Sequence, residues 1–146
     1  KAPGYPGMKV LQFAFDSREE SDYLPHNYEK NCVVYTGTHD NDTTAGWFKS
    51  ANRKDVQMAK KYLNVRLNKD GAWAFIRAAY GSVANLAVIP MQDFLNLGSE
   101  ARINTPSTLG GNWIWRMKED AASEELAKKI RDLAELYCRC KKEDKE

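Results

Sequence analysis

The sequence predicts an α/β fold in which parallel strands alternate with helices. Three short apolar runs, at residues 8–15, 31–37 and 86–92, are typical of buried strands, and segments with a helical spacing of apolar residues lie between the second and third runs. Three such strands form an open sheet with two exposed edges. Three helices cannot cover all of its apolar faces. We therefore expect a segment of a larger α/β sheet.

The first strand is expected after a start rich in proline and glycine. Residues 1–7 suit neither a helix nor a central strand. Residues 8–15 are apolar and aromatic enough for a strand buried on both faces. A long polar loop over residues 16–31 follows and contains His26 and Asn27. Loops of this length in compact domains are usually functional.

The second strand, over residues 31–37, ends abruptly in polar residues: Gly37, His39, Asp40, Asn41 and Asp42. A buried strand that stops in such a cluster is a common way to hold reactive side chains at the mouth of an α/β barrel. Three interpretations are open from the residues alone. The cluster is a metal site, it is a site where a carboxylate and an imidazole bond sugar hydroxyls, or Asp42 or Thr43 simply caps the next helix.

The periodic spacing of apolar residues predicts the remaining elements. A short helix carrying Trp47 and Phe48 is expected first, then helices over residues 55–67 and 72–82, separated by a break at 68–71. The third strand, over residues 86–92, contains Pro90, which would cost a central strand one hydrogen bond.

A second long loop, residues 93–115, follows the third strand and is rich in Gly, Asn, Thr and Pro. Glu100 and Arg102 are expected to pair with each other or with neighbours. Asn112 and Trp113 suit a sugar site, because sugar faces stack on Trp while Asn bonds hydroxyls, but Trp113 and Trp115 suit core lids equally well. The last helix is expected over residues 123–137, and the charged tail 141–146 is expected to be disordered.

Composition excludes several classes of function. The net charge is +2 and no basic stripe is present, so nucleic acid is not an expected partner. No apolar run approaches membrane-spanning length. The three cysteines (Cys32, Cys138 and Cys140) leave one unpaired, which favours a reducing compartment, the cytoplasm or a plastid.

Five motifs occur in one order with compatible gaps: residues 6–13 (PGMKVLQF), 23–28 (YLPHNY), 35–43 (YTGTHDNDT), 97–104 (LGSEARIN) and 111–113 (GNW). Together they closely resemble the C-terminal part of 4-α-glucanotransferases, also called amylomaltases or disproportionating enzymes, of glycoside hydrolase family 77. The resemblance covers residues 4–116.

The resemblance implies an α-amylase-like (β/α)8 TIM barrel. The chain, residues 1–146, would then be the C-terminal segment of this one catalytic domain, with about the last three strands and their helices. The family moves α-1,4-glucan segments between maltooligosaccharides, or onto and from starch glucan, by a retaining double displacement that needs no cofactor and no metal.

Site residues are also implied by the resemblance. Asp40 matches the family's third catalytic carboxylate, which stabilises the oxocarbenium-like transition state. His39 would bond the same sugar, and Asn112, Trp113, His26 and Asn27 are further candidates for glucan contact. Ile114 stands where a charged residue is more usual.

The family's nucleophilic Asp and acid/base Glu lie upstream of the PGMK motif, so we expect the isolated chain to be inactive. Its partner would be the N-terminal part of the same barrel. A standalone glucan-binding or interaction module is the alternative. Self-association through exposed sheet edges is expected for the isolated chain.

Overall fold

The computed structural model describes residues 4–140, so the tail predicted at 141–146 lies outside the described residues. The chain divides into two compact units, Lys1–Trp115 and Arg116–Glu146. The first unit carries the sheet and the second carries the last helix.

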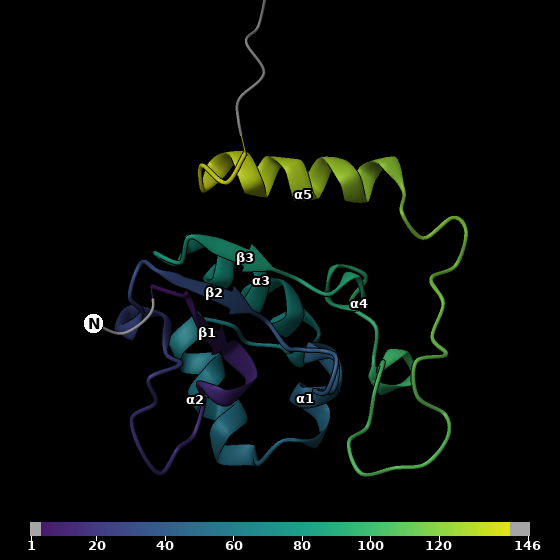
Figure 1. Cartoon of the computed structure of the whole chain (residues 1–146), viewed down its shortest axis with the longest axis horizontal. Helices are drawn as coiled ribbons and strands as arrows, with labels where there is room; N and C mark the ends of the chain where they lie inside the picture. The colour runs from purple at the N-terminus through teal and green to yellow at the C-terminus, as the bar shows by residue number, and fades with distance from the viewer. Residues whose placement is uncertain (1–3, 141–146) are drawn as a thin grey trace, which may run out of the picture. The chain divides into compact units, whose positions relative to one another are not determined.

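Three parallel strands form the sheet of the first unit: β1 (Gly7–Val10), β2 (Cys32–Tyr35) and β3 (Leu86–Val88). Figure 1 shows them side by side in the order β1-β2-β3, with β2 in the centre. The register pairs Met8 with Val33 and Val33 with Leu86. The prediction of parallel strands is confirmed. Helices cross over between β2 and β3 as predicted, whereas β1 is joined to β2 by a long loop with two 3-10 turns.

All three strands are shorter than predicted, and β2 covers only Cys32–Tyr35 of the expected residues 31–37. β1 ends at Val10, and the next residues form a 3-10 turn, Leu11–Phe13, in place of the second half of a strand. The chain leaves the sheet there because Gln12 bonds the segment after β2. The third strand ends at Val88, and Pro90 caps a short helix, α4 (Met91–Phe94). A proline costs nothing at a helix start, where its missing N–H has no partner to lose.

Three helices connect β2 to β3: α1 (Thr44–Ser50), α2 (Arg53–Leu63) and α3 (Gly71–Gly81). Thr43 caps α1 by accepting a hydrogen bond from the N–H of Gly46, as one of the predictions had it. Helix α2 ends four residues earlier than expected, because Asn64 adopts a left-handed conformation with φ of 54°. The short turns of the unit are 3-10 turns at Pro25–Asn27, Asn68–Asp70 and Ser99–Ala101.

The hydrophobic core lies between one face of the sheet and the helices α1 to α3. Val34 of β2 packs in one cluster with Phe48 of α1, Ala59 of α2 and Phe75 of α3, all of them buried. The aromatic rings meet at close range, and the centroids of Phe48 and Phe75 lie 5.4 Å apart. The helices therefore cover this face of the sheet, most completely at Val34 of the central strand.

The opposite face of the sheet is apolar and partly exposed in the first unit. Met8, Val33 and Leu86 stand in one row across the three strands. Met8 is 57% exposed and Leu86 is 53% exposed, and Val88 beside them is 39% exposed. Exposed apolar side chains in a row on a sheet are costly in water, so this face is suited to packing against further protein.

The second unit contains helix α5 (Glu124–Leu136). Ser123 caps it by accepting a hydrogen bond from the N–H of Leu126, and Glu124 and Glu125 lie in the first turn, where the helix dipole favours acidic residues. The helix predicted over residues 123–137 is confirmed.

Two further properties concern the whole described chain. No disulfide joins the three cysteines, all of which lie within the described residues: Cys32 is buried, and Cys138 and Cys140 are exposed. Within residues 4–140, every helix falls short of the length and apolarity needed to cross a membrane.

Candidate functional site

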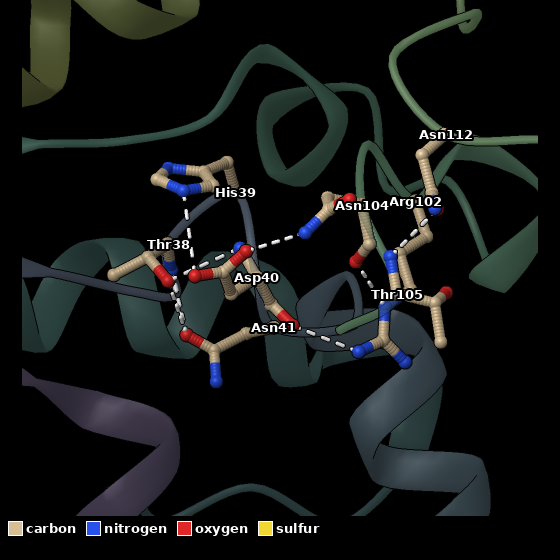
Figure 2. Close-up of polar contacts among 8 residues, drawn as sticks. All are labelled: Thr38, His39, Asp40, Asn41, Arg102, Asn104, Thr105 and Asn112. Atoms are coloured by element: carbon tan, nitrogen blue, oxygen red, sulfur yellow. Dashed lines mark hydrogen bonds and ion pairs between the residues drawn. The ribbon is translucent and has the colours of Figure 1, made fainter. Parts of the chain in front are cut away.

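The segments that follow the three strands meet at the carboxyl-terminal end of the sheet. Because the strands are parallel, their carboxyl ends lie on the same side, which is where open α/β sheets and barrels place their ligands. Gln12 comes after β1, the turn with His39 and Asp40 comes after β2, and the segment with Arg102 and Asn104 comes after β3. Figure 2 shows the second and third of these in contact.

The turn after β2 presents His39 and Asp40 outward. The Asn41 side-chain oxygen accepts hydrogen bonds from the Thr38 N–H (2.9 Å) and the Thr38 hydroxyl (2.8 Å), which closes the turn. His39 Nε2 lies 3.4 Å from Asp40 Oδ2, and the two side chains are 54% and 50% exposed. Strand alternation does not separate these neighbours, because β2 ends at Tyr35. Asn41 itself is occupied in the turn.

Residues after β3 hold Asp40 from the other side (Figure 2). Asn104 Nδ2 donates to Asp40 Oδ1 at 2.6 Å, and Arg102 Nη2 donates to the Asp40 backbone carbonyl at 2.8 Å. The Asn104 N–H donates to the His39 carbonyl at 3.1 Å. Arg102 thus bonds backbone carbonyls of the site, while Glu100, its predicted partner, accepts from the Gly98 N–H at 2.9 Å.

Gln12 holds the same turn from the end of β1. Its side-chain Nε2 donates to the Asp42 carbonyl at 2.7 Å, and its backbone N–H donates to the Thr36 carbonyl at 3.3 Å. Gly37 makes room for this contact, because a Cβ at that position would lie 2.5 Å from Gln12 Nε2. A side chain at position 37 would therefore displace the Gln12 amide from its bond to the Asp42 carbonyl.

Asp93, in α4, is a buried carboxylate beneath the turn, with 1% of its surface exposed. It accepts hydrogen bonds from the Thr36 hydroxyl (2.5 Å), the Thr44 N–H (2.8 Å) and the Thr44 hydroxyl (2.8 Å). Burial raises the pKa of Asp93 above its ordinary value of 3.8, although these three donors act in the opposite direction. The carboxylate ties the end of β2 and the start of α1 to α4.

Asp42 has a structural role. Its Oδ1 accepts from the Thr43 N–H at 2.7 Å and its Oδ2 accepts from the Ser99 hydroxyl at 2.6 Å. The helix cap itself is Thr43. A cavity of about 20 Å³, which is large enough for about one water molecule, lies between Asp42, Asp93 and Arg102.

Trp113 lies against His39. The two ring centroids are 5.1 Å apart with an angle of 39° between the planes. The Trp113 N–H donates to the Ile103 carbonyl at 2.7 Å, which joins it to the segment that holds Asp40. Trp113 is 58% exposed, so its ring is a surface feature and not a lid on the core.

Asn112 closes the loop that leads to Trp113. Its side-chain oxygen accepts from the Thr105 N–H at 2.8 Å, and its Nδ2 donates to the Thr108 hydroxyl at 3.0 Å. Gly110 and Gly111 have φ of 78° and 73°, a conformation that favours glycine. The Asn112 amide is thus engaged within its own loop.

The structure places His26 and Asn27 in a different set of contacts. His26 Nδ1 lies 2.9 Å from the Tyr62 hydroxyl, and the rings of His26 and Tyr62 are stacked at 5.7 Å. Asn27 Nδ2 donates to Glu20 Oε1 at 3.0 Å. Of the predicted site residues, His39, Asp40 and Trp113 are brought together, whereas the side chain of Asn112 bonds only Thr105 and Thr108 of its own loop. His26 and Asn27 are not joined to them by these contacts.

A metal interpretation gains no support from the arrangement of side chains. Within the part of the chain that the structure describes, no group of three or more His, Cys, Asp or Glu residues is placed to hold a metal ion.

Sequence reasoning missed the residues that support the site: Gln12, Asp93, Arg102 and Asn104. The signal in the sequence that could have identified them is their position shortly after predicted strands. Gln12 comes two residues after β1, and Asp93, Arg102 and Asn104 all follow β3.

Residues 1–122 match the model of the glycoside hydrolase family 77, described as 4-alpha-glucanotransferase. The chain is 52% identical over 141 residues to the 4-alpha-glucanotransferase of Clostridium butyricum, covering 96% of this chain and 29% of that protein. It is 48% identical over 142 residues to a chloroplastic/amyloplastic 4-alpha-glucanotransferase of Arabidopsis thaliana, covering 95% of this chain and 25% of that protein.

A solved structure agrees with these matches. The amylomaltase from Streptococcus agalactiae in complex with acarbose superposes with a TM-score of 0.89 at 34% sequence identity, covering 94% of this chain and 28% of that one. The chain therefore spans between about a quarter and a third of the length of these relatives.

Proposed function

The chain belongs to the 4-alpha-glucanotransferase family, glycoside hydrolase family 77, and we propose that it supplies the transition-state-stabilising carboxylate of such an enzyme. That carboxylate is Asp40. The enzyme would transfer α-1,4-glucan segments between maltooligosaccharides or starch chains. Its nucleophile and its acid/base would come from the part of the relatives that this chain does not span.

One observation carries the proposal. Asp40 is held by Asn104 and Arg102, yet half of its side chain stays accessible beside His39 and Trp113. A carboxylate that is both fixed and accessible can accept hydrogen bonds from sugar hydroxyls. A group fixed before the reaction needs no reorganisation when positive charge develops on the sugar, which is the basis of electrostatic catalysis.

The mechanism follows from the charge and position of these groups. In a retaining transfer, one carboxylate attacks the anomeric carbon, an acid protonates the leaving oxygen, and an acceptor sugar resolves the glycosyl-enzyme. Asp40 would accept hydrogen bonds from the reacting glucose and oppose the positive charge of its oxocarbenium-like transition state. His39 would bond the same glucose, and the exposed face of Trp113 would stack on a sugar ring. Transfer exceeds hydrolysis when the closed site excludes water.

The sheet supports the proposal that these three strands are about the last three of a (β/α)8 barrel. Helices cover one face, and the opposite face carries the row Met8, Val33 and Leu86, in which Met8 and Leu86 are exposed and Val33 is half-buried. In such a barrel the helices lie outside and layers of apolar strand side chains fill the interior. The uncovered apolar face would then be the barrel interior, and β1 and β3 would pair with strands from the remainder of the enzyme.

A chimera tests the proposed function. The segment of the Clostridium butyricum relative that precedes the matched region is joined to this chain, which is 52% identical to the region that it replaces. We expect the chimera to convert maltotriose into glucose and longer chains, and the isolated chain to do neither. Activity in the isolated chain, or its absence in a chimera that unfolds cooperatively, would contradict the proposal.

Asp40→Asn in the chimera tests the residue assignment. We expect kcat to fall by about 100- to 1,000-fold, the range seen when one electrostatic stabiliser is removed. Asp22→Asn is the matched control, because Asp22 is an exposed carboxylate in the loop before β2 and should leave kcat unchanged. Equal kcat values for Asp40→Asn and Asp22→Asn would show that Asp40 does not contribute to catalysis.

A standalone glucan-binding module remains the second candidate function, since an exposed Trp113 beside His39 is itself a typical sugar platform. It requires that the isolated chain binds maltoheptaose at millimolar concentration and that Trp113→Ala weakens this binding. Titration calorimetry measures both. No heat of binding would eliminate this alternative.

The isolated chain is also proposed to self-associate through its open edges, as unpaired strands invite pairing. Sedimentation velocity would show concentration-dependent association of the chain and a single species for the chimera. A monodisperse isolated chain would contradict this.

A further inference from the structure

The segment after β3 makes hydrogen bonds to the turn after β2 with both its side chains and its backbone. Arg102 uses two nitrogens: Nη2 donates to the Asp40 carbonyl and Nε donates to the Asn104 carbonyl, both at 2.8 Å. Asn104 donates its side-chain amide to Asp40 Oδ1 and its backbone N–H to the His39 carbonyl. Figure 2 shows Arg102 below and Asn104 beside the Asp40 carboxylate. Two segments more than 60 residues apart in sequence are thereby joined at the proposed catalytic carboxylate.

The two oxygens of Asp40 are consequently different. Oδ1 accepts the short 2.6 Å bond from Asn104, whereas Oδ2 lies towards His39 at 3.4 Å. A rotation of the carboxylate would break the bond from Asn104. We propose that Asn104 and Arg102 are positioning residues, which fix the plane of the Asp40 carboxylate and present Oδ2 to the reacting sugar. This inference rests on the proposed function of Asp40.

Asn104 acts on the carboxylate and is not needed to hold the turn. The turn is held independently by the Gln12 bond to the Asp42 carbonyl and by the Asn41 bonds to Thr38. The Asn104 N–H bond to the His39 carbonyl comes from the backbone, so it persists when the side chain is removed. Asn104→Ala therefore deletes one interaction of interest, the bond to Asp40 Oδ1.

The kinetic test uses the chimera described above. We expect Asn104→Ala to lower kcat for maltotriose disproportionation by about 10- to 100-fold, the range for partners that orient a functional group, with KM changed by less than about threefold. Arg102→Lys keeps the charge but cannot make both hydrogen bonds that Arg102 donates from Nε and Nη2. We expect its loss of kcat to be smaller than that of Asn104→Ala. Asn85→Ala, an exposed asparagine just before β3 at the other end of that strand, is the control and should match the wild type.

A double-mutant cycle distinguishes positioning from a structural role. If Asn104 acts through Asp40, Asn104→Ala should lower kcat by less than about twofold in the Asp40→Asn background. The full 10- to 100-fold loss in that background, or wild-type kcat for Asn104→Ala alone, would overturn the inference. Thermal unfolding of each variant shows that the compared proteins are folded.

An experiment without turnover separates this inference from the proposed function. In the isolated chain, the NMR resonances of the Asn104 side-chain amide should shift in Asp40→Asn and stay in place in Asp42→Asn, because Asp42 bonds Ser99 and Thr43 instead. An inactive wild-type chimera with this NMR result refutes the proposed function alone. Unmoved Asn104 resonances in Asp40→Asn would overturn the positioning inference whatever the activity.

Discussion

Replacement of Asp93 should reveal how the site is fastened to the fold. This carboxylate is almost fully buried and accepts three hydrogen bonds, two from Thr44 and one from Thr36. Asp93→Ala removes all three acceptor contacts at once. The hydroxyls can turn towards other acceptors, but the N–H of Thr44 has a fixed direction.

The expected loss follows from these contacts. A buried N–H left without an acceptor costs about 1–3 kcal/mol, and each hydroxyl bond lost adds about 0.5–1.5 kcal/mol. With one N–H and two hydroxyl bonds affected, we therefore expect Asp93→Ala to lower the free energy of unfolding by about 2–6 kcal/mol. Asp93→Asn keeps the shape and an oxygen acceptor for the Thr44 N–H, so it should cost less at neutral pH.

The pH dependence gives a sharper test, because the sign is fixed by the raised pKa of Asp93. Its pKa in the folded state lies above the ordinary 3.8, since burial disfavours the charged form. Between these two pKa values the folded chain binds more protons than the unfolded chain, so stability falls as the pH rises. The contribution of Asp93 to the free energy of unfolding is fully present below pH 3.8. It is lost as the pH rises through the pKa that Asp93 has in the folded state.

Urea unfolding of the wild type and Asp93→Asn from pH 3.5 upward measures this contribution. The stability advantage of the wild type over Asp93→Asn should shrink as the pH rises. Asp16→Asn is the control: the Arg18 guanidinium lowers the pKa of Asp16 from 3.8 to about 2, so the contribution of Asp16 to stability is lost only at lower pH and its difference from the wild type should stay nearly constant over this range. If the wild-type advantage at Asp93 grows with pH, the three donors outweigh burial and our reasoning about this residue is wrong.

Three further predictions concern the turn and its surroundings. Gly37→Ala should lower stability by about 1–3 kcal/mol, because the added methyl group displaces Gln12; urea unfolding measures the loss. Thr43→Ala should cost about 1 kcal/mol by removing the cap that accepts from Gly46, and thermal unfolding would detect it as a lower Tm. Trp113→Ala in the chimera should raise KM for maltotriose by about tenfold if its face stacks on sugar, and an unchanged KM would contradict that contact.

Local sequence patterns predicted the elements of the fold well. The β-branched run ending at Tyr35 is a strand, the cap at Thr43 starts a helix, and the strands are parallel. Errors occurred where a distant contact decides the local structure. The first strand was predicted to run to residue 15, but it ends at Val10 because Gln12 turns to bond a carbonyl 30 residues away.

The site was predicted only in part for the same reason. His39 and Asp40 are adjacent and follow a strand, so a local pattern is enough to find them. Their supports, Asn104 and Arg102, lie more than 60 residues further along the chain. No periodicity links residues so far apart, and only the parallel order of the strands indicates that their loops meet.

The half-exposed position of Asp40 determines how strongly it can act. Two unit charges 4 Å apart interact by about 1 kcal/mol in bulk water and by about 4 kcal/mol at the effective dielectric constant near a protein surface. The Asp40 side chain is 50% exposed, so part of its effect on a sugar cation would be lost to water. A glucan stacked on Trp113 would exclude water from the adjacent His39 and Asp40 and recover that part. The support from Asn104 and the cover from bound glucan would therefore be complementary, since orientation would fix the position of the charge and exclusion of water would set the strength of its interaction with the sugar.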